Sequence, residues 1–288
     1  MDRIDMAEQV ASTDPRAPQS GRLKFQKILV PADSKETAEL MIPLARKLLA
    51  RGGEIVTLNI IDTSFPLEVI DKWKKSTKIS IAAVEAGYRH EVTVTPEVKN
   101  SRSIVGSILE EISLRSIGLL MFVINPHEGK KSFRFGSKTR SIARNSACSV
   151  MMLNKLTLTM PRKPSGNILV AIRGDEEGRE LLAIAKSLSD ELGDLPIIQY
   201  RMPDGGSRRR EQHRPHSGSG DYRTFAKVYY GTRVADAILG ELSKERYSIV
   251  LISSNISKSK LPFYSGGAFE YLMKNAPCPV MIYRKVTR

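Results

Sequence analysis

Apolar residues along the chain fall into two kinds of pattern. Short segments such as 26–31 and 117–124 are strand-like, and the runs 55–61 and 195–200 lack polar alternation, which suits strands buried on both faces. Between them, apolar residues recur at helical spacing. The first such helix is marked by Ala38, Ile42, Ala45 and Leu49, with Gly52 and Gly53 predicted as its C-cap. Strands alternating with helices over short connections predict a doubly wound α/β fold with a parallel sheet.

The whole pattern occurs twice. The segment around Ile28 recurs around Ile168, and Cys148-Ser-Val-Met recurs as Cys278-Pro-Val-Met. Helices predicted at 104–114 and 137–145 have counterparts later in the chain, at 234–242 and 267–275. We therefore expect two tandem doubly wound domains, each a five-stranded parallel open sheet with helices on both faces.

The copies set the expected boundaries. These are a disordered N-terminal arm at 1–24, a first domain at 25–156, a linker at 157–165 and a second domain at 166–288. The copies differ most where the first has a predicted helix at 66–87. Residues 201–223 of the second copy, rich in Gly, Ser, Arg and His, instead predict a basic loop.

Charge and composition narrow the functional class. The formal net charge of +14 favours a polyanionic ligand, whether nucleotide, nucleic acid or acidic lipid, although a solubility role is an equal alternative. The two cysteines suggest no disulfide framework and are interpreted as small core residues. No apolar run is long enough to cross a bilayer, and 1–24 has no secretory pattern, so we expect a cytoplasmic protein.

Several segments together resemble one family. Gly266-Gly-Ala-Phe-Glu-Tyr-Leu-Met-Lys-Asn-Ala-Pro-Cys-Pro-Val-Met resembles the closing helix and strand of universal stress protein domains, and Gly136-Ser-Lys-Thr-Arg-Ser-Ile-Ala-Arg-Asn-Ser-Ala-Cys-Ser-Val is similar. Ile28-Leu-Val-Pro-Ala-Asp-Ser also resembles the family's first strand and its Asp-bearing turn. The resemblance runs from about residue 25 onward as two tandem copies.

This resemblance implies a nucleotide site in the first copy. ATP-binding members carry an Asp after the first strand and a G-x-x-G-x9-G-[S/T] pattern leading into the last helix. Such glycines let backbone amides approach phosphate at a helix N-terminus, at the carboxyl ends of the strands. The implied site residues are Pro31, Ala32, Asp33, Ser34, Ile61, Val123, Gly129, Gly136, Ser137 and Lys138.

The glycine pattern is incomplete in the first copy. Val123 and Pro126 stand at its two earlier glycine positions, and Gly129 lies out of register. The basic run 130–144 could replace the missing amides with cationic side chains, or it could form a solvated helix face. Asp33 could equally be an N-cap or Asx-turn residue that opens the helix at Ser34.

The second copy departs further from the pattern. Arg173 stands at the Asp position, and Ser253 and Ile256 stand at the earlier glycine positions; only Gly266-Gly267 keeps the end of the motif. We therefore expect a division of labour in which this copy is the structural partner. Elsewhere, Trp73 among several lysines predicts a surface helix whose aromatic side chain either contacts a partner or packs on the sheet.

The expected function is a nucleotide-responsive or stress-related regulatory module rather than an enzyme; slow ATP hydrolysis stays open, without a nameable base. The ligand implied is ATP or a related nucleotide, with no metal beyond its Mg²⁺. The resemblance implies pairing of the two copies through their last strands, and allows a further homo-oligomer or a membrane transporter partner. Nucleic acid is disfavoured because the chain shows no aromatic stacking platform.

The alternative is an interaction module that binds no nucleotide. It would use the basic surface and the 201–223 loop to dock onto an acidic protein, the cytoplasmic face of a transporter or anionic lipid.

Overall fold

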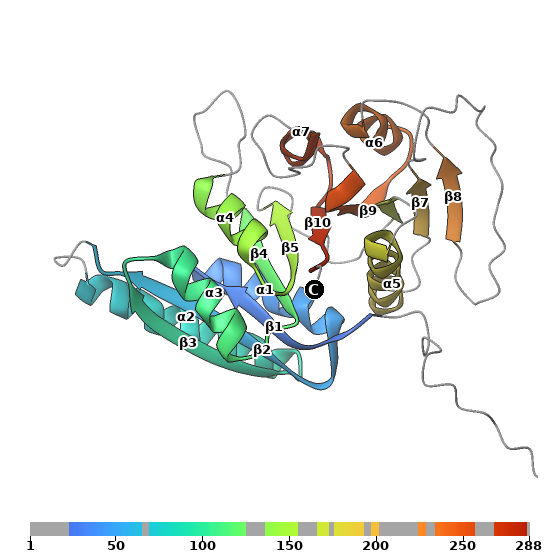
Figure 1. Ribbon diagram of the computed structural model, residues 1–288. Helices are drawn as coiled ribbons and strands as arrows, with labels where there is room; N and C mark the ends of the chain where they lie inside the picture. Colours follow the sequence, from blue (N-terminus) through green and yellow to red (C-terminus); the bar gives the residue numbers. More distant parts are fainter. Residues whose placement is uncertain are drawn as a thin grey trace, which may run out of the picture.

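A single ten-stranded sheet runs through the molecule, in the order β3-β2-β1-β4-β5-β10-β9-β6-β7-β8 (Figure 1). This is a computed structural model. It describes residues 23–64, 69–124, 136–154, 166–172, 176–192, 197–201, 224–228, 234–256 and 268–286.

The two halves of the sheet have the same strand order. The first half comprises β1 (Phe25–Pro31), α1 (Lys35–Leu48), β2 (Leu49–Asp62), α2 (Val69–Arg89), β3 (Thr93–Ser101), α3 (Ile104–Leu114), β4 (Leu119–Ile124), α4 (Ser137–Asn145) and β5 (Ser149–Asn154). The second half comprises β6 (Asn167–Ile172), α5 (Glu176–Glu191), β7 (Ile197–Arg201), β8 (Thr224–Val228), α6 (Val234–Leu242), β9 (Tyr247–Ser253), the 3-10 turn η3 (Ser254–Ile256), α7 (Ala268–Asn275) and β10 (Val280–Arg284). Within each half all described strand pairs are parallel, as the unalternating apolar runs predicted.

The last strands of the halves join the sheet. β10 pairs with β5 in antiparallel orientation, from Met281 against Leu153 to Arg284 against Val150. The expected contact between last strands is therefore present. The division into two separate domains stays a prediction, because both hydrophobic layers run across this junction: each contains buried side chains of both halves.

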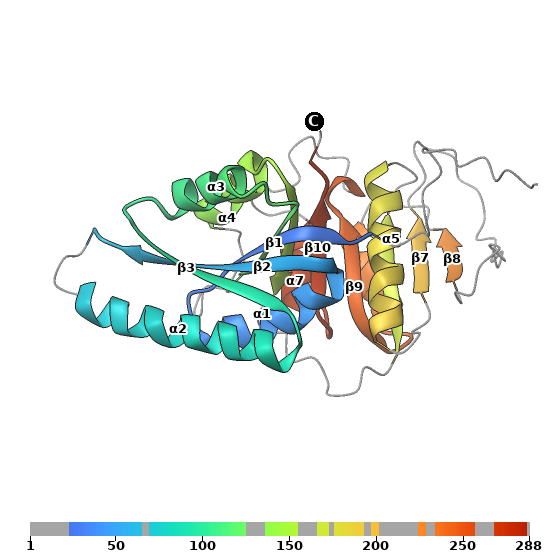
Figure 2. The same cartoon turned by 90° about the horizontal axis from the view of Figure 1, so that it is seen from below.

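Helices cover both faces of the sheet. Buried side chains of α1, α2 and α5 pack on one face, and those of α3, α4, α6 and α7 on the other. Figure 2 shows α1 and α2 on the opposite side of the first half from α3 and α4. The helical spacing of α1 places Ala38, Met41, Ala45 and Leu48 against the strands. In the part of the chain that the structure describes, no helix is long and apolar enough to span a membrane.

Two local predictions were wrong. α1 ends at Leu48 and β2 begins at Leu49, so Gly52 and Gly53 lie inside a strand and are not a helix C-cap. Gly52 has φ of +73°, a conformation that glycine adopts without strain, next to a register shift between β1 and β2.

The N-terminal arm was also predicted to extend too far along the chain, to residue 24. Residues 23 and 24 were predicted to be its end, but they contact the second half. The Leu23 carbonyl accepts a hydrogen bond from Ser187 Oγ at 3.3 Å, and Lys24 Nζ lies 3.6 Å from a carboxylate oxygen of Glu191. Residues 1–22, the linker residues 157–165 and most of the 201–223 loop lie outside the described residues. Arg201 belongs to β7.

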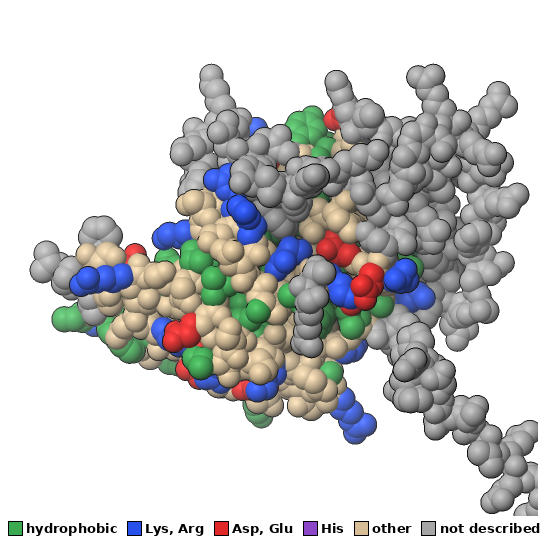
Figure 3. All heavy atoms as spheres, viewed as in Figure 1, with side chains coloured by type: hydrophobic (Ala, Val, Ile, Leu, Met, Phe, Trp, Pro, Cys, Tyr) green, Lys and Arg blue, Asp and Glu red, His purple; other side chains and the backbone are tan. Residues whose placement is uncertain are grey.

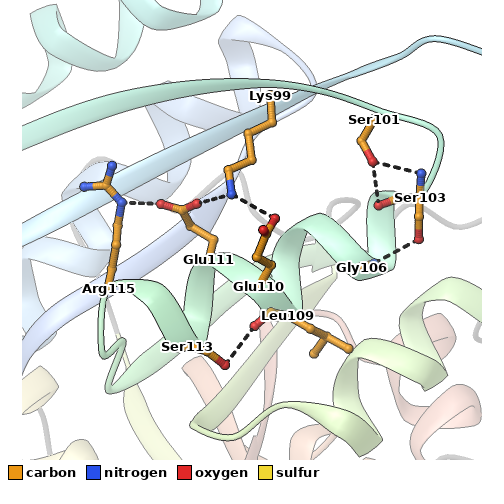
Figure 4. A network of polar contacts seen from close by, with 9 residues as sticks. All are labelled: Lys99, Ser101, Ser103, Gly106, Leu109, Glu110, Glu111, Ser113 and Arg115. Carbon is orange, nitrogen blue, oxygen red and sulfur yellow. Dashed lines mark hydrogen bonds and ion pairs between the residues drawn. The ribbon is translucent and has the colours of Figure 1, made fainter.

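A buried carboxylate ties α3 to the sheet edge. Glu111 on α3 is nearly fully buried and is contacted by Lys99 of β3 at 2.7 Å and by Arg115 at the end of its own helix (Figure 4). Burial raises the pKa of Glu111, but hydrogen bonds from Lys99 and Arg115 outweigh it and hold that pKa below the ordinary value. The N-terminus of α3 is capped by Ser103, whose Oγ accepts from the Gly106 amide at 3.0 Å.

Candidate functional site

A cleft of about 600 Å³ opens at the carboxyl ends of β1, β2 and β4, beneath α3 and the N-terminus of α4. This is the edge of a doubly wound sheet where ligands bind, and the volume is typical of small-molecule sites. The fold creates the cleft because the chain leaves β1 toward one face of the sheet and leaves β4 toward the other.

The structure brings most of the predicted site residues to this cleft, and these are Pro31, Ala32, Asp33, Val123, Gly136, Ser137 and Lys138. Ser34 and Ile61 do not line it. Ser34 is used within α1 as its N-cap. Ile61 is buried, and strand alternation points its side chain to the opposite face from Ile60, which does line the cleft. Gly129 lies outside the described residues.

Asp33 projects at the rim from the turn between β1 and α1. Its Oδ1 accepts a hydrogen bond from Thr37 Oγ1 at 3.0 Å, and its side chain is exposed. The N-cap of α1 is Ser34, whose Oγ accepts from the Thr37 amide at 3.2 Å, so capping does not account for Asp33. The turn is held to β2 by Asn59, whose Nδ2 donates to the Ala32 carbonyl at 2.7 Å. Asp33 is therefore held in place with a carboxylate oxygen available to a ligand.

Sequence reasoning missed most of the cleft wall, which is apolar. The apolar members are Leu58, Ile60, Ile104, Ile108, Phe122, Ile124 and Ile142, accompanied by the polar Thr37, Asn59 and Thr139. The sequence did contain a signal for this wall. Because parallel strands end at one edge of a sheet, the last residues of 55–61 and 117–124 had to lie close together there. An apolar wall beside Asp33 suits a flat ring system that carries hydroxyl groups.

The N-terminus of α4 forms the other wall. The Arg140 amide makes the first intrahelical bond, to the Gly136 carbonyl at 3.1 Å, so the amides of 137–139 have no acceptor within the helix. The first turn holds no acidic residue, and Gly136 gives no side-chain cap. Figure 3 shows Lys and Arg side chains gathered over α4, which carries Lys138, Arg140 and Arg144. The helix dipole and these cations favour an anionic group here.

Two further observations bear on this wall. Among the residues that the structure describes, none has an atom within 4 Å of a Cβ added at Gly136. The pKa of Asp62, at the end of β2, is lowered mainly by hydrogen bonds from Ser64, with Lys72 and Lys138 adding attraction. Within the described residues there is no group of three His, Cys, Asp or Glu side chains that could hold a metal ion.

The second half differs at the equivalent position. The buried faces of α1 and α5 align so that Glu177 of the second half corresponds to Thr37 of the first. The Glu177 carboxylate accepts from Ser254 Oγ at 3.1 Å, from the Asn255 amide at 3.1 Å and from the Lys285 amide at 3.0 Å. Arg173 and Gly266-Gly267 lie outside the described residues. An internal carboxylate thus joins α5, η3 and the end of β10.

Residues 24–154 match the family model described as the universal stress protein family. No curated protein matches the chain. Among solved structures, a universal stress protein from Archaeoglobus fulgidus DSM 4304 is 14% identical with a TM-score of 0.63, covering 90% of this chain and 96% of its own. The cytoplasmic domain of a prokaryotic cation chloride cotransporter is 13% identical with a TM-score of 0.54, covering 91% and 95%. A functionally unknown protein from Pseudomonas aeruginosa PAO1 is 13% identical with a TM-score of 0.52, covering 91% and 93%. At these identities the structures show the fold alone.

Proposed function

We propose that the first half binds ATP or a related nucleotide in the cleft and that the chain is a regulatory module, not an enzyme. The observation that carries the proposal is the meeting of three features in one cavity: an apolar wall, the Asp33 carboxylate and the open N-terminus of α4. The base would lie against Ile60 and Phe122, Asp33 would accept a ribose hydroxyl, and the phosphates would meet Lys138 and the α4 amides. The family match over residues 24–154 supports this assignment.

Isothermal titration calorimetry of the full chain with ATP, ADP, AMP and cyclic dinucleotides, with and without Mg²⁺, tests the proposal. Asp33→Ala should raise Kd roughly tenfold or more, because a hydrogen bond to a charged group contributes about 1.5–3 kcal/mol. Nucleotide released from the purified protein by denaturation would be identified by mass. Absence of binding by every nucleotide at millimolar concentration would refute the ligand-binding proposal.

Gly136→Ala offers a matched pair with Gly240→Ala. Both positions leave open space around an added methyl group, so both variants should fold. Only the methyl at 136 projects beside the proposed phosphate site, so only Gly136→Ala should weaken binding. Equal affinity in the two variants would mean that the ligand does not approach the α4 N-terminus.

The second candidate is docking of an acidic partner, such as an acidic protein segment or anionic lipid, on the basic side chains of α4. The cluster of Lys138, Arg140 and Arg144 beside the cleft favours it (Figure 3). The same calorimetry separates the two candidates, because a surface that docks through charge alone gives no saturable, Asp33-dependent nucleotide binding.

A further inference from the structure

The outer face of α2 carries a stripe of exposed apolar side chains. Seven large hydrophobic residues are exposed in the part of the chain that the structure describes, and five of them lie on this helix. The five are Ile70, Trp73, Ile81, Val84 and Tyr88, with exposures that range from 42% for Trp73 to 88% for Tyr88. Figure 2 shows α2 along the outer edge of the molecule, with no other element beyond it. Exposed apolar side chains gathered on one face are a common feature of protein interaction surfaces.

The stripe lies opposite the buried face of the same helix. Ile79, Ala82, Ala83 and Ala86 pack inward on the sheet and α1. The exposed residues recur at spacings of three and four, with Thr77 filling the gap between Trp73 and Ile81, so they form one line along the helix. The stripe therefore faces away from the sheet along the length of α2.

The positions of the stripe are nearly symmetric about Ile79: reversing their order along the helix superimposes each position on another to within one residue. When a second copy of α2 is laid antiparallel with a twofold axis at the level of Ile79, Ile70 faces the partner's Tyr88. The same operation sets Trp73 within one residue of the level of the partner's Val84, and Thr77 against the partner's Ile81. Large side chains thus face smaller or flatter ones along the line. Self-complementarity of this kind is what an isologous contact between two copies requires.

The charges beside the stripe fit the same arrangement. Asp71, Lys74, Lys78, Glu85 and Arg89 all project on one flank of the line, and a twofold antiparallel contact brings like flanks together. Lys74 then meets the partner's Glu85, and Asp71 meets the partner's Arg89. Within one chain Lys74 and Asp71 already lie 3.8 Å apart and Arg89 pairs with Glu39 at 3.5 Å, so the new contacts extend these exposed pairs. Lys78 lies near the axis beside its own counterpart, a like-charge contact that long lysine side chains relieve by extending into solvent. Mixed signs on this flank match a copy of the chain better than an anionic bilayer.

We propose that two copies of this chain associate through α2, antiparallel about a twofold axis near Ile79. The contact is distinct from the β5–β10 junction, which is already filled within one chain. It does not depend on the nucleotide cleft, since α2 packs on the opposite face of the sheet from α3 and α4. One helix pair about 30 Å long makes a modest interface, so association should be concentration-dependent.

Analytical ultracentrifugation of the full chain from micromolar to submillimolar concentration tests the proposal. We expect a shift from the 32.1 kDa monomer to a dimer, and Ile81→Glu should raise the dimer Kd roughly tenfold or more. Leu114→Glu is the matched control, because Leu114 is 70% exposed on α3, away from the stripe. A chain that stays monomeric, including one that instead sediments with anionic vesicles, would overturn the proposal. So would a dimer that Ile81→Glu leaves intact.

A charge exchange gives a sharper result that a folding defect cannot mimic. Lys74→Glu alone and Glu85→Lys alone should each weaken the dimer, since each sets like charges against each other across the axis. The double variant should restore it. Lys74 and Glu85 lie about 16 Å apart along one helix, so rescue requires that they meet between copies in antiparallel order. Loss of dimer in the double variant as severe as in the singles would contradict the proposed geometry.

Discussion

The two halves of the sheet share a strand order but use the first turn of the following helix differently. In the first half, Thr37 bonds to Asp33 and leaves a cleft beside it. In the second half, Glu177 occupies the matching position, and its carboxylate accepts hydrogen bonds from Ser254, Asn255 and Lys285. One half keeps an acidic group directed at a cavity, and the other uses an acidic group to join its own elements. The comparison contrasts an acidic side chain at a cavity with one that joins structural elements of the same scaffold.

Glu177→Ala should give the largest effect. It leaves the Ser254 hydroxyl and the amides of Asn255 and Lys285 without their charged acceptor, which should cost about 3 kcal/mol of the free energy of unfolding. The urea midpoint of the full chain measures it. Glu177→Gln, which keeps an acceptor oxygen, should lose less. A Glu177→Ala loss no greater than that of a cleft variant would remove the proposed contrast between the halves.

The next prediction compares two buried glutamates at matching positions, Glu111 of the first half and Glu241 of the second. Removing the basic partner should destabilise the protein more at Glu111 than at Glu241. Arg115→Met should cost about 2 kcal/mol, because Glu111 then keeps only its Lys99 contacts. Lys244→Met should change stability by less than about 0.5 kcal/mol, since Lys244 is largely exposed and Glu241 is also held by the Tyr247 hydroxyl at 2.8 Å.

The same pair carries a pH dependence. The pKa of folded Glu111 lies below its ordinary value, so its contribution to stability is complete above the unfolded pKa of about 4.3 and is lost as pH falls below it. Arg115→Met should reduce this loss. Urea midpoints at neutral pH and near pH 4 compare the two proteins, and an equal acid loss in both would assign it to other carboxylates.

Thr37→Val should destabilise the protein less than Glu177→Ala or Arg115→Met does. It removes the hydroxyl's bonds to Asp33 and to Ser34 Oγ, while Ser34 still caps the helix through the Thr37 amide, so the expected cost is about 1 kcal/mol. Nucleotide affinity should fall more noticeably, because Asp33 loses the bond that orients it. Calorimetry and urea unfolding on the same sample separate the two readouts. Unchanged affinity would show that Thr37 does not position Asp33.

Features that depend on residues close together in the sequence could be predicted, whereas those that depend on contacts between distant segments could not. The bounds of α3, α4 and α6 follow from local spacing, and the structure reproduces them. The start of β2 could not be predicted in this way, because pairing with β1 extends the strand through Gly52 despite its turn-like composition. Asp33 and Gly136 were found by resemblance. The apolar cleft wall was missed because its members look like ordinary core residues in sequence.

By itself the sequence determined the alternation of strands and helices, the similarity between segments of the two halves and the residue types at the glycine positions, because these depend on residue type and spacing. Only the tertiary structure decided how the two halves join in the middle of the sheet and where a cleft opens at the strand ends. Continuous hydrophobic layers across β5 and β10 make one sheet of the two copies, and the meeting of strand ends leaves the cleft in the first half. Which hydrophobic residues stay exposed on α2, and which carboxylate is bound internally, depends on packing between distant segments.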